Sequence, residues 1–134
     1  MPKTTAPQDA PPVVGVIDPD PVARSGLRTL LNGLGVDVST FESAESYLLA
    51  ANGRHLSCLI VDLLLPGMSG LELLRRLRNA GDDVPVILLA DESDVPTAVA
   101  AMREGATDFI EKPYVDVAVL KQVQKLLHTP PAHA

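Results

Sequence analysis

The sequence "LIVDLLLPGMSGLELLRRLR", residues 59–78, contains a complete strand–turn–helix unit. A short apolar run stops at Asp62, and the Pro-Gly pair that follows marks a turn. Ser69 and Glu72 then have the spacing of a capping box, and leucines recur at helical intervals beyond them. The stretch therefore predicts a buried strand that ends in an acid, followed by a helix over residues 69–81.

The same alternation of strand and helix recurs along the chain. Three of the strand-like runs are almost continuously apolar, which is typical of parallel strands covered on both faces. Strands that alternate with helices imply a doubly wound parallel sheet with helices on both faces. We therefore expect an α/β fold with five strands, at residues 13–17, 36–41, 58–61, 84–90 and 107–110. The expected helices lie at residues 21–33, 43–53, 69–81, 93–105 and 115–128.

The composition is that of one acidic globular domain. The 134 residues are 46% hydrophobic and carry a formal net charge of −6, so the chain can bury a single core. Binding to nucleic acid or to an anionic membrane surface is not expected, because both need clustered Lys and Arg. The sequence has neither an apolar run near the roughly 20 residues of a membrane helix nor the apolar core of a signal peptide. We expect a cytoplasmic protein without an intrachain disulfide, because Cys58 is its one cysteine.

The two ends of the chain differ in composition from its centre. Residues 1–12 are rich in proline and small or polar residues, and they are predicted to be a disordered leader. Residues 13–128 form the expected folded domain, and residues 129–134, "TPPAHA", are expected to be a tail. No output domain is recognised after the last helix. We therefore expect a single-domain protein whose output is a contact with another protein or with a second copy of itself.

Charged residues follow three of the expected strands. Asp18 ends the first strand, Asp62 follows the third, and Lys112 follows the fifth. Functional groups gather at the carboxyl ends of parallel strands, so we expect these three side chains at one edge of the sheet. Two carboxylates suit Mg²⁺, which prefers oxygen ligands, and an ammonium can neutralise a phosphoryl oxygen. The alternative for Asp62 and Lys112 is a plain salt bridge that joins two strand ends.

Two segments resemble those of a known family. "LIVDLLLPGMSGLELLRRLR" and "GATDFIEKP" (residues 105–113) resemble the parts of the response-regulator receiver domain of two-component signalling that carry its phosphoacceptor aspartate and its lysine. The resemblance covers about residues 13–127. It implies the flavodoxin-like receiver fold, and a phosphoacceptor signalling protein rather than an enzyme.

The resemblance also implies roles for individual residues. Asp62 would accept a phosphoryl group from a sensor histidine kinase or a histidine phosphotransferase, and Lys112 would contact the phosphoryl oxygens. Onward transfer of this group to a histidine phosphotransferase is a third candidate output of the chain. Mg²⁺ would be held by Asp18, Asp62 and the backbone carbonyl of Leu64. Phe109 occupies the position of the family's aromatic switch residue.

The sequence departs from the family at two positions of this site. Pro19 stands where the family has a second acid, so one metal ligand is missing and Mg²⁺ is expected to bind weakly or not at all. Asp20 is placed to cap the next helix, and it is a further candidate ligand. Ala90 stands where the family has Ser or Thr, and alanine cannot donate a hydrogen bond to a phosphoryl group. Phe109 therefore has two interpretations of equal weight, a switch residue that responds to phosphorylation or a half-buried residue that only packs.

Other functions compete with that of a phosphoacceptor. A pseudo-receiver, an interaction module that works without phosphorylation, is favoured by Pro19 and Ala90. "VIDPDPV" (residues 16–22) fits the Asp-x-Asp signature of haloacid-dehalogenase-like phosphatases, but that interpretation leaves "VDLLLPGMSG" unexplained. An FMN carrier is excluded, since "DPDP" offers carboxylates where a phosphate needs N–H groups. A homodimer through the fourth helix, fifth strand and fifth helix is a further expectation, with exposed residues such as Val95 or Val117.

Overall fold

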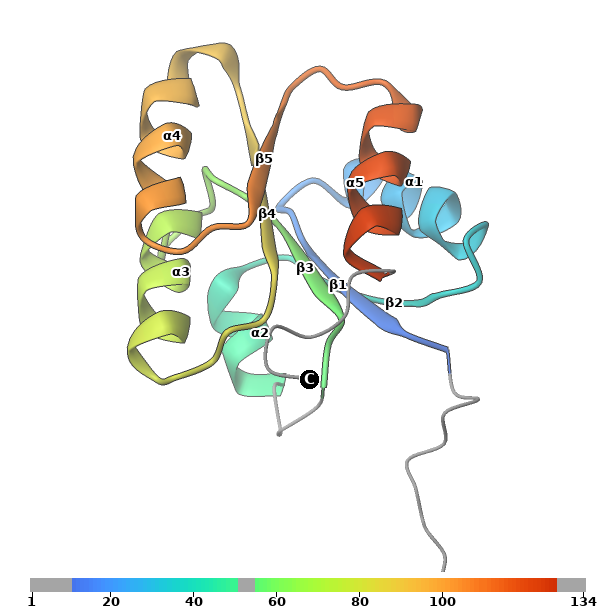
Figure 1. Cartoon of the computed structure of the whole chain (residues 1–134), viewed down its shortest axis with the longest axis horizontal. Coiled ribbons are helices and arrows are strands. Elements are labelled where there is room, and N and C mark those ends of the chain that lie inside the picture. Colours follow the sequence, from blue (N-terminus) through green and yellow to red (C-terminus); the bar gives the residue numbers. More distant parts are fainter. Residues whose placement is uncertain (1–10, 51–54, 128–134) are drawn as a thin grey trace, which may run out of the picture.

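The strands form one parallel sheet with helices on both faces (Figure 1). A computed structural model of the chain describes residues 11–50 and 55–127. The sheet has five strands in the order β2-β1-β3-β4-β5, and every neighbouring pair is parallel. The doubly wound fold predicted from the sequence is therefore confirmed. The strands are β1 (Val13–Ile17), β2 (Asp37–Phe41), β3 (Cys58–Asp62), β4 (Val86–Ala90) and β5 (Asp108–Glu111).

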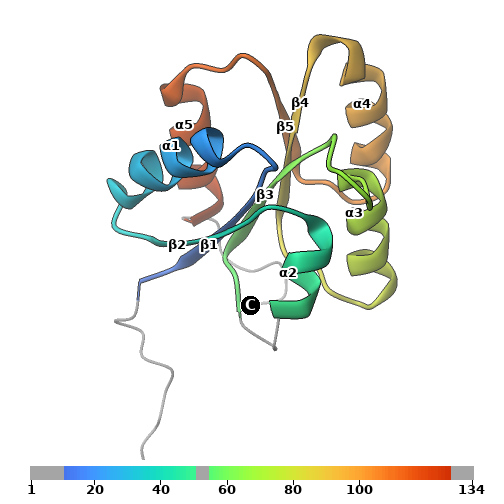
Figure 2. The same ribbon diagram turned by 180° about the vertical axis from the view of Figure 1, so that it is seen from behind.

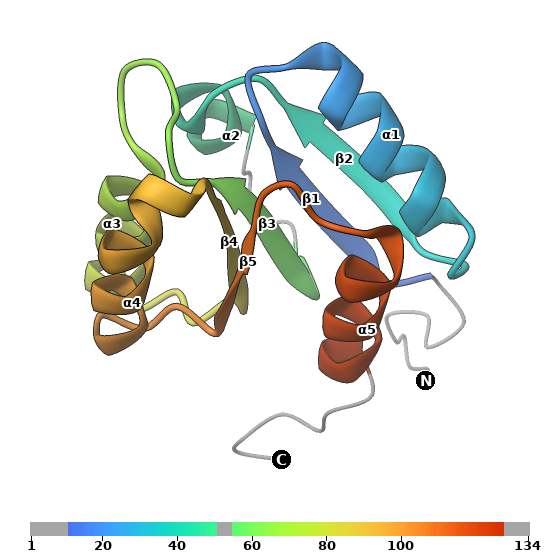
Figure 3. The same ribbon diagram turned by 90° about the horizontal axis from the view of Figure 1, so that it is seen from above.

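The helices divide into two layers. Helices α1 and α5 cover one face of the sheet, and α2, α3 and α4 cover the other (Figures 2 and 3). Asp20 caps α1 and Ser69 caps α3 through side-chain oxygens, as their positions in the sequence predict. The helices are α1 (Pro21–Asn32), α2 (Ala44–Ala50), α3 (Gly70–Asn79), α4 (Val95–Arg103) and α5 (Asp116–Leu127), and a 3₁₀ turn at Glu92–Asp94 precedes α4.

The core consists of two apolar clusters separated by the sheet. Successive residues of β3 point to opposite faces, so Leu59 joins the cluster beneath α2, α3 and α4, while Ile60 joins the cluster beneath α1 and α5. All five residues of β3 and of β4 are buried. Each fully buried large aliphatic side chain contributes roughly 1.5–3 kcal/mol to folding. This burial on both faces explains why these strands have no alternating pattern in the sequence.

Several element boundaries differ from those expected by one or two residues, and proline explains two of them. Strand β4 begins at Val86 and not at residue 84, because Pro85 has no N–H to give to a ladder; its carbonyl accepts a hydrogen bond from Leu59 N at 2.8 Å. Helix α4 begins at Val95 and not at residue 93, because the preceding residues form the 3₁₀ turn and Pro96 lies in the first helical turn.

Parts of the expected elements and ends lie outside the described residues. These are residues 51–53 of the second expected helix, residue 128 of the last one, the tail at 129–134, and the leader up to residue 10. Pro12, within the predicted leader, accepts a hydrogen bond from Asp37 N at 2.9 Å and is tied to β2. Within the described ranges, no helix has the length and apolarity needed to cross a bilayer.

Arg78 joins the loops at the amino-terminal ends of β4 and β5. Its guanidinium donates hydrogen bonds to the carbonyls of Val84 and Gly105, each at 2.8 Å from Nη2, and to the carbonyl of Asp82 at 2.8 Å from Nη1. A planar guanidinium with five donors suits such a set of backbone acceptors. The loops at this edge are thus held to α3 by one side chain.

The first residue of α3 packs against the end of β3. A Cβ on Gly70 would lie 2.7 Å from the Asp62 carbonyl oxygen and 3.0 Å from Leu63 Cα. These contacts are with backbone atoms that cannot move without shifting β3, so Gly70→Ala is expected to lower the free energy of unfolding in a urea titration. Gly26→Ala in α1 is the matched control, because its Cβ would meet nothing within 4 Å. The control is expected to stabilise by about 0.5–1 kcal/mol through helix propensity. Equal effects of the two substitutions would contradict the close approach.

Candidate functional site

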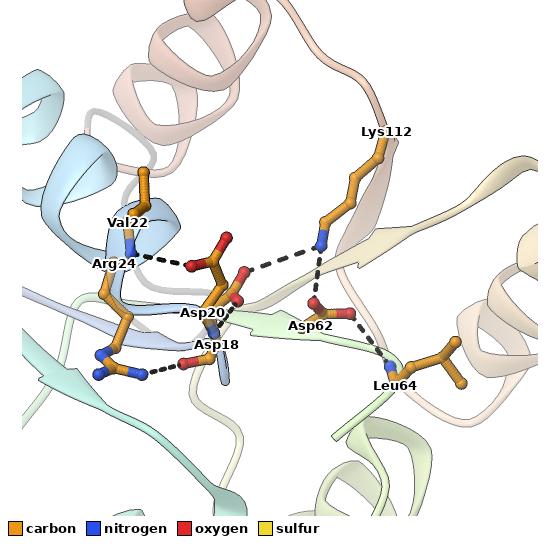
Figure 4. A network of polar contacts seen from close by, with 7 residues as sticks. All are labelled: Asp18, Asp20, Val22, Arg24, Asp62, Leu64 and Lys112. Atoms are coloured by element: carbon orange, nitrogen blue, oxygen red, sulfur yellow. Dashed lines mark hydrogen bonds and ion pairs between the residues drawn. The ribbon is translucent and has the colours of Figure 1, made fainter. Parts of the chain in front are cut away.

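Asp18, Asp62 and Lys112 meet at the carboxyl-terminal edge of the sheet (Figure 4). Lys112 Nζ lies 2.7 Å from Asp62 Oδ2 and 3.8 Å from Asp18 Oδ2. The three residues come from the ends of β1, β3 and β5, and parallel pairing brings these ends to one side of the molecule. Their predicted convergence is therefore confirmed. The contact between Lys112 and Asp62 is a salt bridge that joins two strand ends, and it also places an ammonium beside a carboxylate where a phosphoryl group could be bound.

Asp62 divides its two carboxylate oxygens between the lysine and the following loop. Oδ2 accepts a hydrogen bond from Lys112 Nζ, and Oδ1 accepts one from Leu64 N at 3.1 Å. The residue is only 7% exposed, whereas Leu64 is 56% exposed. The loop start is held by Leu63 N, which donates to Leu89 O at 2.8 Å. Asp62 is thus a nearly buried carboxylate whose neighbour in the loop, Leu64, is exposed to solvent.

Asp18 is the more deeply buried carboxylate, at 1% exposure. Its Oδ1 accepts a hydrogen bond from Asp20 N at 2.9 Å, while its buried Oδ2 has no hydrogen-bond donor among the described residues. Burial raises the pKa of Asp18, and the Asp20 N–H and the charge of Lys112 offset this only in part. Arg24 Nη1 donates to the Asp18 carbonyl at 2.7 Å and fixes the backbone here. An oxygen without a hydrogen-bond donor therefore faces the lysine.

In the "DPDP" segment, the carboxylate of Asp20 caps the start of α1 and does not join those of Asp18 and Asp62. Asp20 Oδ1 accepts a hydrogen bond from Val22 N at 2.9 Å, which satisfies one free N–H of the helix start. Pro19 lies exposed between the two aspartates. Among the described residues, no group of three or more His, Cys, Asp or Glu side chains is arranged to hold a metal ion. The capping role of Asp20 is confirmed, and its role as a ligand stays a prediction.

Lys112 is held in its charged form by its neighbours. Burial lowers the pKa of this lysine, but the hydrogen bond and charge of Asp62, together with the charges of Asp18 and Asp91, outweigh burial and raise it above its usual value. The backbone N–H of Lys112 donates to the carbonyl of Ala90 at 2.8 Å, so the end of β4 positions the lysine. The contact of Arg24 was not predicted from the sequence, since this residue belongs to none of the motifs.

Ala90 and Phe109, the two residues expected at switch positions, are in contact with the core. Ala90 is fully buried in the cluster beneath α2, α3 and α4, and Phe109 is half-buried and packs against that cluster. Phe109 and Ile110 also line a surface hollow of about 870 Å³ beside α5. This arrangement fits half-buried packing, and a switch role for Phe109 stays a prediction.

The expected contact surface on α4, β5 and α5 needs one correction. Val117 is exposed, as expected, but Val95 is half-buried, because it begins α4 directly after the 3₁₀ turn. Val99 and Met102 are the exposed large apolar residues of α4.

Comparison with known families identifies the domain. Residues 14–124 match the response regulator receiver domain. The chain belongs to this family. Receiver-domain relatives are signalling proteins, and the five-stranded parallel sheet of this chain is that of the family.

The similar proteins include curated transcriptional regulators. The chain is 36% identical over 112 residues to transcriptional regulatory protein FixJ of Bradyrhizobium diazoefficiens. The matched region covers 84% of this chain and 55% of FixJ. It is 42% identical over 122 residues to the C4-dicarboxylate transport transcriptional regulatory protein DctD of Pseudomonas aeruginosa. The matched region covers 91% of this chain and 26% of DctD. The chain thus spans about half the length of the first relative and about a quarter of the second.

Solved receiver structures have the same fold. Full-length FixJ from B. japonicum superposes with a TM-score of 0.82 at 34% identity, over 88% of this chain and 58% of that one. The receiver domain of NtrX from Brucella abortus superposes with a TM-score of 0.81 at 30% identity, over 87% of this chain and 99% of that one. The flavodoxin-like receiver fold is therefore shown.

Asp18→Asn tests the electrostatic cost of this site. The ordinary pKa of this carboxyl is 3.8, and burial raises it in the folded protein. At pH values above the raised pKa the carboxyl is ionised in the folded state, and this ionised form lowers the stability of the fold. The asparagine is neutral, and its carbonyl can still accept from Asp20 N. We expect the variant to be more stable than the parent at neutral pH, and the difference to vanish as pH falls below the ordinary pKa. Thermal unfolding over a pH series measures this, and an equal difference at all pH values would contradict the burial of a charged Asp18.

Proposed function

We propose that the chain is a response regulator that accepts a phosphoryl group on Asp62 from a histidine of a sensor histidine kinase or a histidine phosphotransferase. The observation that carries the proposal is the 2.7 Å contact between Lys112 Nζ and Asp62 Oδ2 at the carboxyl-terminal edge. An ammonium beside the attacking carboxylate is also beside the phosphoryl oxygens of the product. Family membership supports the same assignment. The exchange is proposed to take place in the cytoplasm.

In the proposed step, a phosphoryl group passes from a histidine nitrogen to a carboxylate oxygen of Asp62. A carboxylate oxygen of Asp62 attacks the phosphorus of a phosphohistidine, and an O–P bond forms as the P–N bond breaks. The imidazole nitrogen keeps the bonding pair and takes up a proton, which leaves an acyl phosphate on Asp62. Negative charge on the phosphoryl oxygens is neutralised by Lys112. The raised pKa of Lys112 keeps its ammonium protonated through the neutral range.

The donor set fits Mg²⁺ in a weak site. Mg²⁺ binds through one or two carboxylates and keeps several waters, and Asp18 offers a buried oxygen that lacks a donor. We propose Asp18, Asp62 and the Leu64 carbonyl as its ligands, with Asp20 as a further candidate. When bound, Mg²⁺ supplies positive charge at the phosphoryl oxygens. Pro19 contributes no carboxylate, so the affinity is proposed to be low.

A second candidate function is that of a phosphorylation-independent interaction module. Pro19 and Ala90 favour it, because each lacks a side-chain group that the family uses in phosphorylation. In this case the output would be made by the α4–β5–α5 surface, where Val99, Met102 and Val117 are exposed. A homodimer through that surface is part of the proposal.

Intact mass after incubation with acetyl phosphate separates the two functions. The protein is treated over a series of Mg²⁺ concentrations, beside Asp62→Asn as the control. We expect a phosphoryl adduct on the parent, none on the control, and a requirement for high Mg²⁺. The absence of an adduct with acetyl phosphate and with an active histidine kinase would favour the interaction module.

The same series includes Pro19→Asp, which restores a carboxylate at the missing position. It is expected to lower several-fold the Mg²⁺ concentration that gives half-maximal adduct. Pro21→Asp is the charge-matched control, because its carboxylate would lie in the first turn of α1. An equal change in both variants would mean that added charge alone acts.

Leu64→Asn tests whether the exposed leucine shields the acyl phosphate. Leu64 follows Asp62 by two residues, its backbone N–H donates to that carboxylate, and its side chain is exposed at the surface. An apolar side chain there should exclude the attacking water, and an asparagine should admit it. We expect the phosphorylated variant to decay several-fold faster than the parent, measured by loss of the adduct mass after the donor is removed.

Leu49→Asn is the control for this substitution, because Leu49 is an exposed leucine of α2. Its decay rate should match that of the parent. A Leu64→Asn protein that keeps its phosphoryl group as long as the parent, or longer, would overturn the shielding role.

A further inference from the structure

Glu45 binds the loop that leads away from Asp62. This glutamate lies in the first turn of α2, and its Oε2 accepts a hydrogen bond from Met68 N at 2.8 Å, across 23 positions of the sequence. Met68 belongs to the loop of residues 63–69, which joins β3 to α3 and is called here the β3–α3 loop. Neither the family motifs nor the site described above includes Glu45.

The carboxylate of Glu45 lies directly against the backbone of this loop. Gly67 has a φ of +75°, which favours glycine, and a Cβ added there would lie 2.5 Å from Glu45 Oε2. The Met68 N–H lowers the pKa of Glu45, so the group is ionised at neutral pH. Hydrogen bonds to an ionised acceptor are roughly twice as strong as those between neutral groups.

The other side of the β3–α3 loop is bound to the site itself. Leu64 N donates to Asp62 Oδ1 at 3.1 Å, and the loop closes where Gly70 N donates to Leu63 O at 2.9 Å. Leu64 is therefore held between Asp62 on one side and, four residues later, the Glu45 contact on the other. A change at Met68 can reach Leu64 through this short and closed segment.

We propose that Glu45 is a positioning residue, which holds the β3–α3 loop so that the backbone of Leu64 stays on the carboxylate of Asp62. The part of this inference that concerns Mg²⁺ and phosphate rests on the proposed function. The part that concerns the geometry of the loop does not, because it refers to the protein without phosphate.

Two substitutions separate the hydrogen bond from the charge. Glu45→Gln keeps an oxygen that can accept from Met68 N, and Glu45→Ala removes the acceptor. Glu104→Ala is the control, because it breaks a two-bond contact with Arg75, at 2.6 and 2.8 Å, which joins α4 to α3 outside the loop.

The first measurement is amide hydrogen exchange by NMR on the unphosphorylated protein. We expect the Leu64 amide to exchange several-fold faster in Glu45→Ala than in the parent, and Glu45→Gln to stay close to the parent. The Glu104→Ala control should leave the Leu64 amide unchanged. An unchanged Leu64 amide in Glu45→Ala would overturn the proposal, whatever the effect on thermal stability.

The second measurement is the Mg²⁺ dependence of adduct formation from acetyl phosphate. Glu45→Ala should need several-fold more Mg²⁺ for half-maximal adduct, with Glu45→Gln again near the parent. An unchanged Mg²⁺ dependence would overturn the functional part of the proposal. If the parent forms no adduct with acetyl phosphate or with an active histidine kinase while its Leu64 amide responds to Glu45→Ala, the proposed phosphoryl transfer fails and the positioning role is supported.

Discussion

The ammonium of Lys112 lies against two carboxylates at an edge where the sheet is covered on both faces. In the strand order β2-β1-β3-β4-β5, this side chain must cross the end of β4 to reach Asp62 on β3. The strand that it crosses ends in the small, buried Ala90, whose carbonyl also holds the lysine backbone. Removing one partner of a buried ion pair costs about 3–5 kcal/mol, because a charge is left uncompensated. The contact therefore links the ends of β1, β3 and β5 at this edge.

Much of the fold could be predicted because its signals are local. The apolar runs gave the strands, and Ser69 and Asp20 marked helix starts through the chemistry of their own side chains. Asp62 and Lys112 could be placed together because parallel strands end at one edge. The contact of Glu45 with Met68 could not be predicted, since its acceptor is one surface glutamate among many and its donor is a backbone N–H 23 positions away. Arg24 bound to the Asp18 carbonyl was missed for the same reason.

The backbone of the site is hydrogen-bonded around Pro19 and at Ala90. Asp20 both caps α1 with its side chain and donates its N–H to Asp18, so the turn through Pro19 is satisfied without a second acid. Ala90 lacks a hydroxyl but keeps the carbonyl contact to Lys112. A carboxylate at position 19 and a hydroxyl at position 90 are thus not needed to build the edge. A chain can lack both groups and still present the same surface to a partner.

The contacts of Arg78 lie at the opposite end of the strands from this edge. One guanidinium joins three backbone carbonyls before β4 and β5, and none of its partners belongs to the site. The two ends of the strands are thus held by different chemistry, an arginine on backbone carbonyls at one end and an ion pair at the other. A substitution that changes the side chains of the Asp62 edge therefore leaves the arginine contacts at the far end in place.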